Sequence, residues 1–144
     1  MRVRLVIATG VLLASALAPL AHAEGTPPAP LGGVDDLSVH GFGSVGEDST
    51  VTLTGSYRCL DDSAGPVFVS STLVQGDRSA GIGGTRAVCD GHLHEWVNTS
   101  VVKDPAYQPG RARVQATLMQ LTAGEAGLPT PDFLAVEESA VELR

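Results

Sequence analysis

The chain has 144 residues, and its 16 acidic residues outnumber 9 basic ones to give a formal net charge of −7. Nucleic acids and anionic membranes reward clustered lysine and arginine, so this charge balance argues against both as partners. A chain of this length is expected to form a single folded domain.

Residues 1–23 are typical of a signal peptide. Arg2 and Arg4 provide a basic start, an apolar run follows, and small residues occupy Ala21 and Ala23. This pattern predicts cleavage between Ala23 and Glu24. Thr9, Gly10, Ser15 and Pro19 interrupt the apolar run, so we do not expect it to remain as a membrane anchor. The prediction is therefore a secreted, extracellular protein with no membrane insertion after cleavage.

The mature chain divides into a short lead-in and one domain. Residues 24–33, "EGTPPAPLGG", are rich in proline and glycine and predict a flexible lead-in. Residues 34–144 form the expected domain. Valine, threonine and glycine are common there and aromatic residues are few, a composition typical of short strands and tight turns.

Short runs of strand-like residues alternate with turn residues along this domain. The clearest run is 49–59, where Val51, Leu53, Tyr57 and Cys59 fall on one face and threonines on the other. In 111–121, Ala112, Val114, Ala116 and Leu118 alternate in the same way. The expected strands are 34–40, 49–59, 66–75, 82–89, 92–102, 111–121 and 132–143.

A tight turn is expected after Cys89, and the last segment fits two kinds of secondary structure. Asp90-Gly91 lies between two strand-like runs and predicts a two-residue hairpin, because glycine tolerates positive φ. Residues 132–143 also fit a helical face through Phe133, Val136 and Ala140. A strand is favoured there, because an isolated terminal helix would leave the sheet edge uncovered.

Seven short strands and no convincing helix favour an all-β fold, an immunoglobulin-like two-sheet sandwich. The only cysteines, Cys59 and Cys89, end strands that run in the same direction, so both lie at one end of the sandwich. An even pair in an exported protein predicts one disulfide.

The segments "TVTLTGSYRC", "GPVFVSSTLVQ", "GIGGTRAVCDGHLHEW" and "YQPGRARVQATLMQL" together resemble small secreted actinobacterial proteins grouped as a domain of unknown function. The resemblance covers residues 49–121. It implies export, one disulfide and a β-sandwich, and it brings no activity and no catalytic residues.

Several side chains near the cysteines are candidates for a site. Asp61 and Asp62 follow Cys59, while Asp90, His92 and His94 follow Cys89. His92 and His94 share one face of a strand and are geometrically able to bind zinc or copper, although a solvated hairpin face is the favoured interpretation. Trp96 lies on the same alternate face, either filling the core or forming an exposed ligand platform.

A binding function is favoured over catalysis. Ser70 or Ser71 can be combined with the histidines and aspartates as a hydrolase triad, but neither serine has the G-x-S-x-G frame of a nucleophile elbow. We therefore expect a secreted, non-catalytic binding module, monomeric and without cofactor, whose partner is an extracellular protein or small ligand. Its expected surface is the pair of turns after Cys59 and Cys89. An extracellular metalloprotein or hydrolase using His92 and His94, and a secreted protease inhibitor, are the alternatives.

Overall fold

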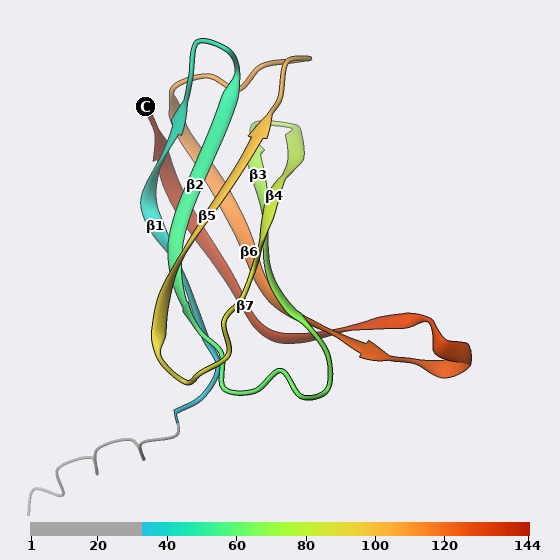
Figure 1. Ribbon diagram of the computed structural model, residues 1–144. Coiled ribbons are helices and arrows are strands. Elements are labelled where there is room, and N and C mark those ends of the chain that lie inside the picture. Colours follow the sequence, from blue (N-terminus) through green and yellow to red (C-terminus); the bar gives the residue numbers. More distant parts are fainter. Residues whose placement is uncertain (1–32) are drawn as a thin grey trace, which may run out of the picture.

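The computed structural model describes residues 33–144, so the predicted signal peptide, its cleavage site and residues 24–32 of the lead-in lie outside the described residues. Seven strands and one short 3-10 helix follow one another (Figure 1). The strands are β1 (Asp36–Val45), β2 (Thr50–Arg58), β3 (Val67–Gln75), β4 (Arg78–Arg86), β5 (Leu93–Val101), β6 (Gly110–Ala123) and β7 (Pro129–Leu143), and the helix is η1 (Glu125–Gly127).

All seven strands belong to one mixed sheet of order β4-β3-β6-β7-β1-β2-β5. Neighbours are antiparallel except β1 and β7, which pair in parallel at Phe42 and Gly43 of β1. The two edge strands approach each other, and the Thr85 hydroxyl oxygen on β4 lies 2.9 Å from the Val97 carbonyl oxygen on β5. The sheet is therefore nearly closed and barrel-like. The predicted seven-stranded all-β fold is confirmed, whereas the structure does not divide the strands into two separate sheets, because β1 bonds to both β2 and β7.

The core is built by the alternation of side chains along each strand. Val51, Leu53, Tyr57 and Cys59 are buried on the inner face of β2, as predicted. The predicted inner residues of β6, from Ala112 to Leu118, are buried as well. Because successive side chains of a strand point to opposite faces, a period of two in the sequence was enough to identify both rows.

Tyr107 anchors the corner between β5 and β6. Its ring is buried, and its hydroxyl donates to the Leu73 carbonyl of β3 at 2.8 Å. Burial raises the pKa of this phenol above its ordinary value. The hydroxyl therefore fastens the long corner to a neighbouring strand.

The strand bounds differ from the prediction most clearly at β1, which extends to Val45 instead of residue 40, and at β4. β4 begins at Arg78, four residues before the predicted start, and pairs with β3 through a tight turn at Gly76 and Asp77. The predicted Asp90-Gly91 hairpin is wrong. β4 pairs with β3 and β5 pairs with β2, so this turn crosses between the two edges of the sheet. Gly91 does take the positive φ that its turn requires, 78°.

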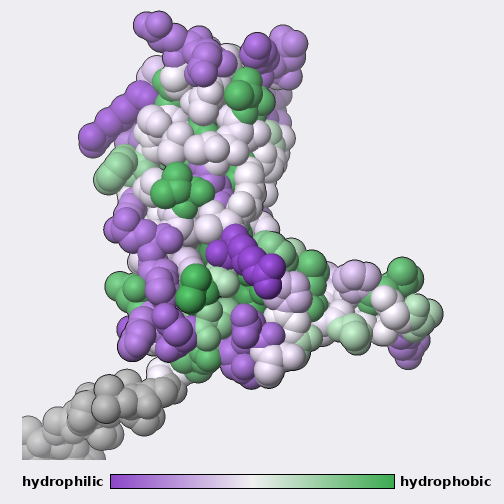
Figure 2. Space-filling view, in the orientation of Figure 1, coloured by the Kyte–Doolittle hydropathy of each residue, from purple (hydrophilic) through white to green (hydrophobic). Residues whose placement is uncertain are grey.

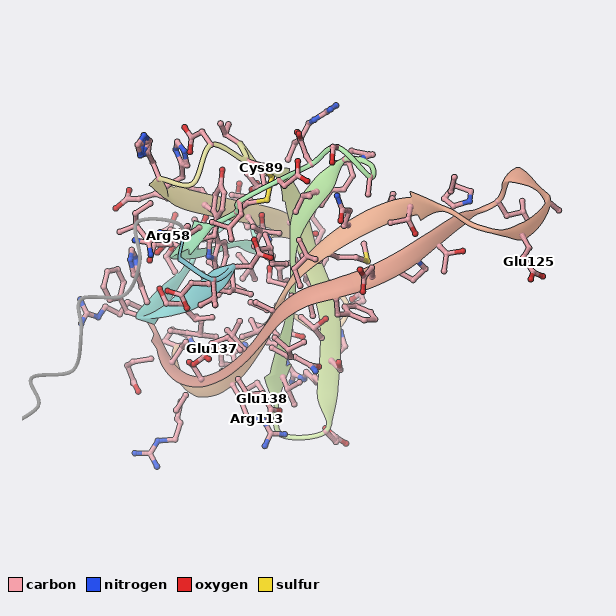
Figure 3. The ribbon with its side chains drawn as sticks, turned by 90° about the horizontal axis from the view of Figure 1, so that it is seen from below. Arg58, Cys89, Arg113, Glu125, Glu137 and Glu138 are labelled. Atoms are coloured by element: carbon pink, nitrogen blue, oxygen red, sulfur yellow. A yellow bond between two sulfur atoms is a disulfide. The ribbon has the colours of Figure 1, made fainter. Side chains whose placement is uncertain are left out.

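The last segment is a strand, β7, and it starts at Pro129. It forms a long hairpin with β6, and β6 leaves β3 beyond Gln120. The end of this hairpin, residues 121–132, projects away from the body of the molecule as an arm (Figures 1 and 3). Exposed apolar side chains include Leu128 on the arm and Phe133 and Val136 beside it, and Figure 2 shows green, hydrophobic atoms on the arm.

A buried polar group connects the two edges of the sheet. The Asn98 amide on β5 donates to the Val69 carbonyl at 3.2 Å and to the Ser71 hydroxyl at 2.9 Å. Its carbonyl oxygen accepts from the Thr85 hydroxyl at 2.7 Å. Since Asn98 is buried, its match to a glycosylation acceptor does not provide an exposed attachment site.

Replacing Asn98 by alanine is expected to lower the free energy of unfolding by about 1–3 kcal/mol, because it leaves buried polar partners unpaired. Chemical denaturation of the wild type and of N98A measures the difference. Thr99→Ala, at the neighbouring exposed position on β5, is the control and should change stability by less than about 0.5 kcal/mol. Equal losses in the two variants would contradict a special role for the buried amide.

Candidate functional site

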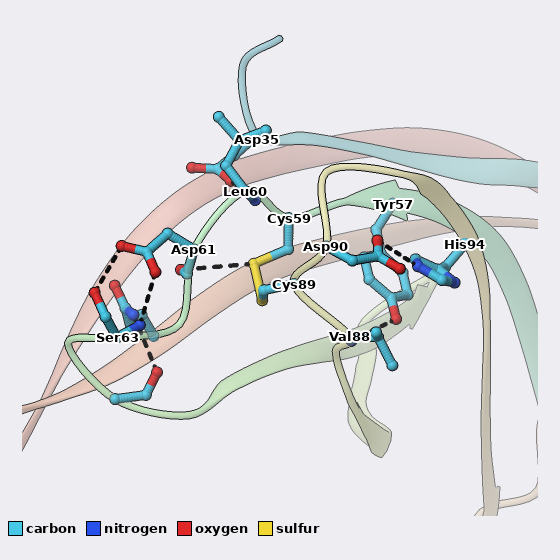
Figure 4. The surroundings of a disulfide bond; sticks show 12 residues. Asp35, Tyr57, Cys59, Leu60, Asp61, Ser63, Val88, Cys89, Asp90 and His94 are labelled. Carbon is cyan, nitrogen blue, oxygen red and sulfur yellow. Dashed lines mark hydrogen bonds and ion pairs between the residues drawn. A yellow bond between two sulfur atoms is a disulfide. The ribbon is translucent and has the colours of Figure 1, made fainter. Parts of the chain in front are cut away.

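The disulfide joins the two turns that the sequence singled out. Cys59 directly follows β2, and its sulfur is bonded to Cys89 at 2.06 Å, with the Cα atoms 4.4 Å apart (Figure 4). The Gly91 N–H also donates to the Cys59 carbonyl at 2.9 Å. The predicted pairing is confirmed, and the two turns are held together by a covalent bond and a backbone hydrogen bond.

The turn after Cys59 is ordered by aspartates. The Asp61 carboxylate accepts from the Ser63 hydroxyl at 2.7 Å and from the Ser63 N–H at 3.0 Å. These two bonds favour the charged form and lower the pKa of Asp61 below its ordinary value. The Leu60 N–H donates to the Asp35 carboxylate at 2.9 Å, which connects the turn to the segment before β1.

The turn after Cys89 has its own aspartate at the centre. The Asp90 carboxylate accepts from the His92 N–H at 2.9 Å and lies 2.8 Å from Nε2 of His94. The His94 ring stacks on Tyr57 with 5.6 Å between ring centroids, and the Tyr57 hydroxyl accepts from the Val88 N–H at 2.8 Å. Figure 4 shows these groups side by side next to the disulfide. These contacts tie the turn after Cys89 to Tyr57 of β2.

The pKa of Asp90 lies below its ordinary value, first because of the His92 N–H and second because of the His94 side chain. A carboxyl group with a lowered pKa stabilises the fold above its unfolded-state pKa, and this contribution is lost as the pH falls through the lower, folded-state pKa. In His94→Ala the pKa of Asp90 should rise but stay below its ordinary value, because the His92 N–H remains as a donor. Carbon-detected NMR titration of the Asp90 carboxyl measures both values. A complete return to the ordinary pKa of an aspartate in the variant would contradict the dominance of the His92 N–H.

The structure separates the candidate residues into exposed and buried groups. Asp61, Asp62, Asp90 and His92 are exposed, and His94 is partly buried against Tyr57. Trp96 is completely buried, and its indole N–H donates to the Ser38 carbonyl at 3.0 Å. Trp96 therefore fills the core and has to be removed from the candidate binding surface. The alternate face of β5 turns inward along its length, from His94 through Trp96 to Asn98.

The histidine and serine candidates for metal binding and hydrolysis include residues that are engaged in other contacts. Within residues 33–144, no group of three or more histidine, cysteine, aspartate or glutamate side chains is placed to hold a metal ion. Nε2 of His94 is already engaged by Asp90. Ser71 is buried, and its hydroxyl donates to the Ile82 carbonyl at 2.7 Å, so it serves the core and is not presented as a nucleophile.

The match to a protein family covers residues 33–144, the entire described domain. The family is DUF6299, described as a family of unknown function. The chain belongs to this family. Because the match spans all seven strands and both cysteines, the DUF6299 assignment applies to the β domain as a whole.

Other comparisons add little to the DUF6299 assignment. None of the curated proteins compared with the chain matches it. One solved structure, that of a Bordetella pertussis protein assigned as ApaA, is 14% identical, with 75% of this chain and 95% of that chain covered and a TM-score of 0.34. In the described part of this family member, no helix is both long and apolar enough to cross a membrane.

The sequence did not reveal the structural role of Asn98, whose hydrogen bonds connect β5 to β3 and β4. A single asparagine in an alternating strand is typical of an exposed position. The alternation of side chains along β5 could have indicated that Asn98 is buried. Asn98 is two residues from Trp96, so both share the inward face of the strand.

Proposed function

We propose that this protein is an exported, non-catalytic binding domain whose recognition surface is the disulfide end, formed by Asp61, Asp62, Asp90 and His92. The observation that supports it is the joining of two exposed acidic turns by the Cys59–Cys89 bond. Loops held by a rigid scaffold recognise partners at low entropic cost, because little ordering remains to be done on binding.

The charge of the surface indicates the chemistry of the partner. Three carboxylates belong to the proposed surface, and the pKa values of Asp61 and Asp90 are lowered, which keeps both groups charged. A basic patch on an extracellular protein is the complementary surface, and opposite charges would speed association and make it sensitive to salt. Export is supported by the composition of residues 1–23 and by the disulfide itself.

We also propose that the sheet is folded in an immunoglobulin-like manner. The pairing of β1 with β2 shifts between Val39 and Gly43, and β1 bonds to β7 at the same place. A strand that changes neighbours at such a shift can carry one sheet over to the other. The Tyr107 hydroxyl bond at the β5–β6 corner is a second feature that supports this arrangement.

The binding surface is tested with the disulfide-bonded protein immobilised and exposed to the extracellular proteins of its source organism. A variant with Asp61, Asp62 and Asp90 all changed to asparagine should lose the retained partner. A charge-matched control changes Glu47→Gln, Asp77→Asn and Glu125→Gln, three exposed positions away from the disulfide end. This control should retain the partner, and raising the salt concentration should weaken retention.

Equal loss in both triple variants would indicate general charge attraction and contradict a local site, and unchanged retention in the disulfide-end variant would do the same. Native mass spectrometry of the secreted protein tests the alternatives. A bound metal that is lost in His94→Ala would replace the proposal with a metalloprotein, and retention of a protease by a single loop would replace it with an inhibitor.

A further inference from the structure

A second surface lies on the outer face of β3, β6 and β7, away from the core. Ser70 and Thr72 point outward from β3, and the register places Thr117 beside Ser70 and Gln115 beside Thr72. Side chains directly opposite each other on neighbouring strands share one face. Four uncharged polar groups therefore form two adjacent rows across the strands.

A hollow of about 360 Å³ lies over these rows. Its lining is completed by Phe133 and Val136 of β7, both of them exposed. The pairing of β6 with β7 shifts between Leu118 and Met119, and Phe133 is the partner of Met119 just beyond that shift. This shift in register places the exposed ring of Phe133 at one end of the two polar rows, which form the floor of the hollow.

On β4, at the edge of the sheet, glycines occupy the next positions of the two rows, so no side chains lie there. Ser70 is paired with Gly84 and Thr72 is paired with Gly81 on β4. A Cβ atom at Gly81 would meet nothing within 4 Å, and one at Gly84 would make only an ordinary contact with the Val69 carbonyl at 3.7 Å. The floor therefore stays open toward β4, so a ligand longer than the hollow has room to continue.

The hollow itself carries no formal charge, because its six lining residues are serine, threonine, glutamine, phenylalanine and valine. At its border, Arg113 and Glu138 lie 3.7 Å apart and offset each other (Figure 3). A surface of this kind offers little to an anion or a cation. It differs in chemistry from the acidic disulfide end.

We propose that this outer face binds an uncharged polysaccharide chain. Sugar hydroxyls both donate and accept hydrogen bonds, and the hydroxyls of Ser70, Thr72 and Thr117 and the amide of Gln115 do the same. The C–H face of a sugar ring packs against an aromatic ring, the part that Phe133 supplies. This ligand and surface are independent of the partner proposed for the disulfide end.

Isothermal titration calorimetry of the disulfide-bonded protein with cellohexaose, maltohexaose and xylohexaose tests the site. At least one of these neutral oligosaccharides should bind, and Phe133→Ala should weaken that binding about tenfold, equivalent to about 1.4 kcal/mol. Gly84→Leu, which places a side chain on the open floor, should weaken it at least as much. The matched control is Phe42→Ala, since Phe42 is 51% exposed compared with 58% for Phe133 but belongs to β1.

The controls separate this proposal from the previous one. The disulfide-end triple variant should bind the oligosaccharide like the wild type, whatever its effect on the protein partner. No binding of any of the three probes, or equal weakening by Phe42→Ala and Phe133→Ala, overturns the proposal. Binding of a fatty acid such as palmitate with the same dependence on Phe133, and no sugar binding, would overturn it in favour of an apolar ligand.

Discussion

Replacing Trp96 by alanine is expected to lower the free energy of unfolding by about 3–5 kcal/mol, the largest effect of any single substitution considered. The indole is completely buried and donates to the Ser38 carbonyl, so the variant loses both apolar burial and a hydrogen bond. The indole also fits against Gly55, where an added Cβ would collide with the Ser38 carbonyl oxygen and with the ring. No neighbouring side chain at Gly55 can expand to fill the cavity.

Urea denaturation followed by far-ultraviolet circular dichroism measures this loss, because the tryptophan fluorescence disappears with the substitution. Val97→Ala is the control: Val97 is adjacent on β5 but exposed, and its truncation should cost less than about 1 kcal/mol. An equally small loss of unfolding free energy in Trp96→Ala and in Val97→Ala would contradict a central place for Trp96 in the core. The loss of stability in Trp96→Phe should be intermediate, because phenylalanine keeps part of the apolar volume.

Removing the disulfide is expected to be nearly as costly. The bond closes a loop with a sequence separation of 30 residues, which corresponds to about 3.5 kcal/mol in the chain-entropy model. For a domain of this size, such a loss lowers Tm by roughly 10–20 °C. The double variant Cys59→Ala with Cys89→Ala is preferred to the double serine variant. Cys59 is buried, so a serine hydroxyl at that position would be shielded from water.

Thermal unfolding of the oxidised wild type, the reduced wild type and the double variant measures the effect. The last two should agree closely, since both lack the cross-link. Hydrogen exchange adds a local readout, and the Gly91 N–H, bonded to the Cys59 carbonyl, should lose protection first. An unchanged Tm in the double variant would show that the two turns hold together without the bond, and would weaken the case for a rigid surface built on it.

The strands of the core were predictable because their signal is local. Alternation in β2 and β6 identified the buried residues correctly, and the phase of β5 places Trp96 and Asn98 on the same inward face. The predicted Asp90-Gly91 hairpin failed because turn residues report backbone conformation and not the partner of the next strand. Gly91 has its positive φ in a turn that joins the two edges of the sheet.

The two candidate surfaces also differ in whether the sequence alone could predict them. The sequence predicted a surface of Asp61, Asp62, Asp90 and His92 because these residues lie near the cysteines, and the disulfide brings their two turns together. The hollow over Ser70, Thr117 and Phe133 was not found. Its residues come from three strands, and they meet only through the register of β3 with β6 and of β6 with β7.

By itself, the sequence determined the all-β class, the inward rows of the main strands and the pairing of its only two cysteines. These properties follow from side-chain alternation and from a two-cysteine count, which need no knowledge of distant contacts. Only the tertiary structure decided the strand order, the near closure of β4 on β5, the burial of Asn98 and the surface that Phe133 completes. Each of these depends on pairing between residues far apart in the chain, and such pairings are selected by the packing of the whole sheet.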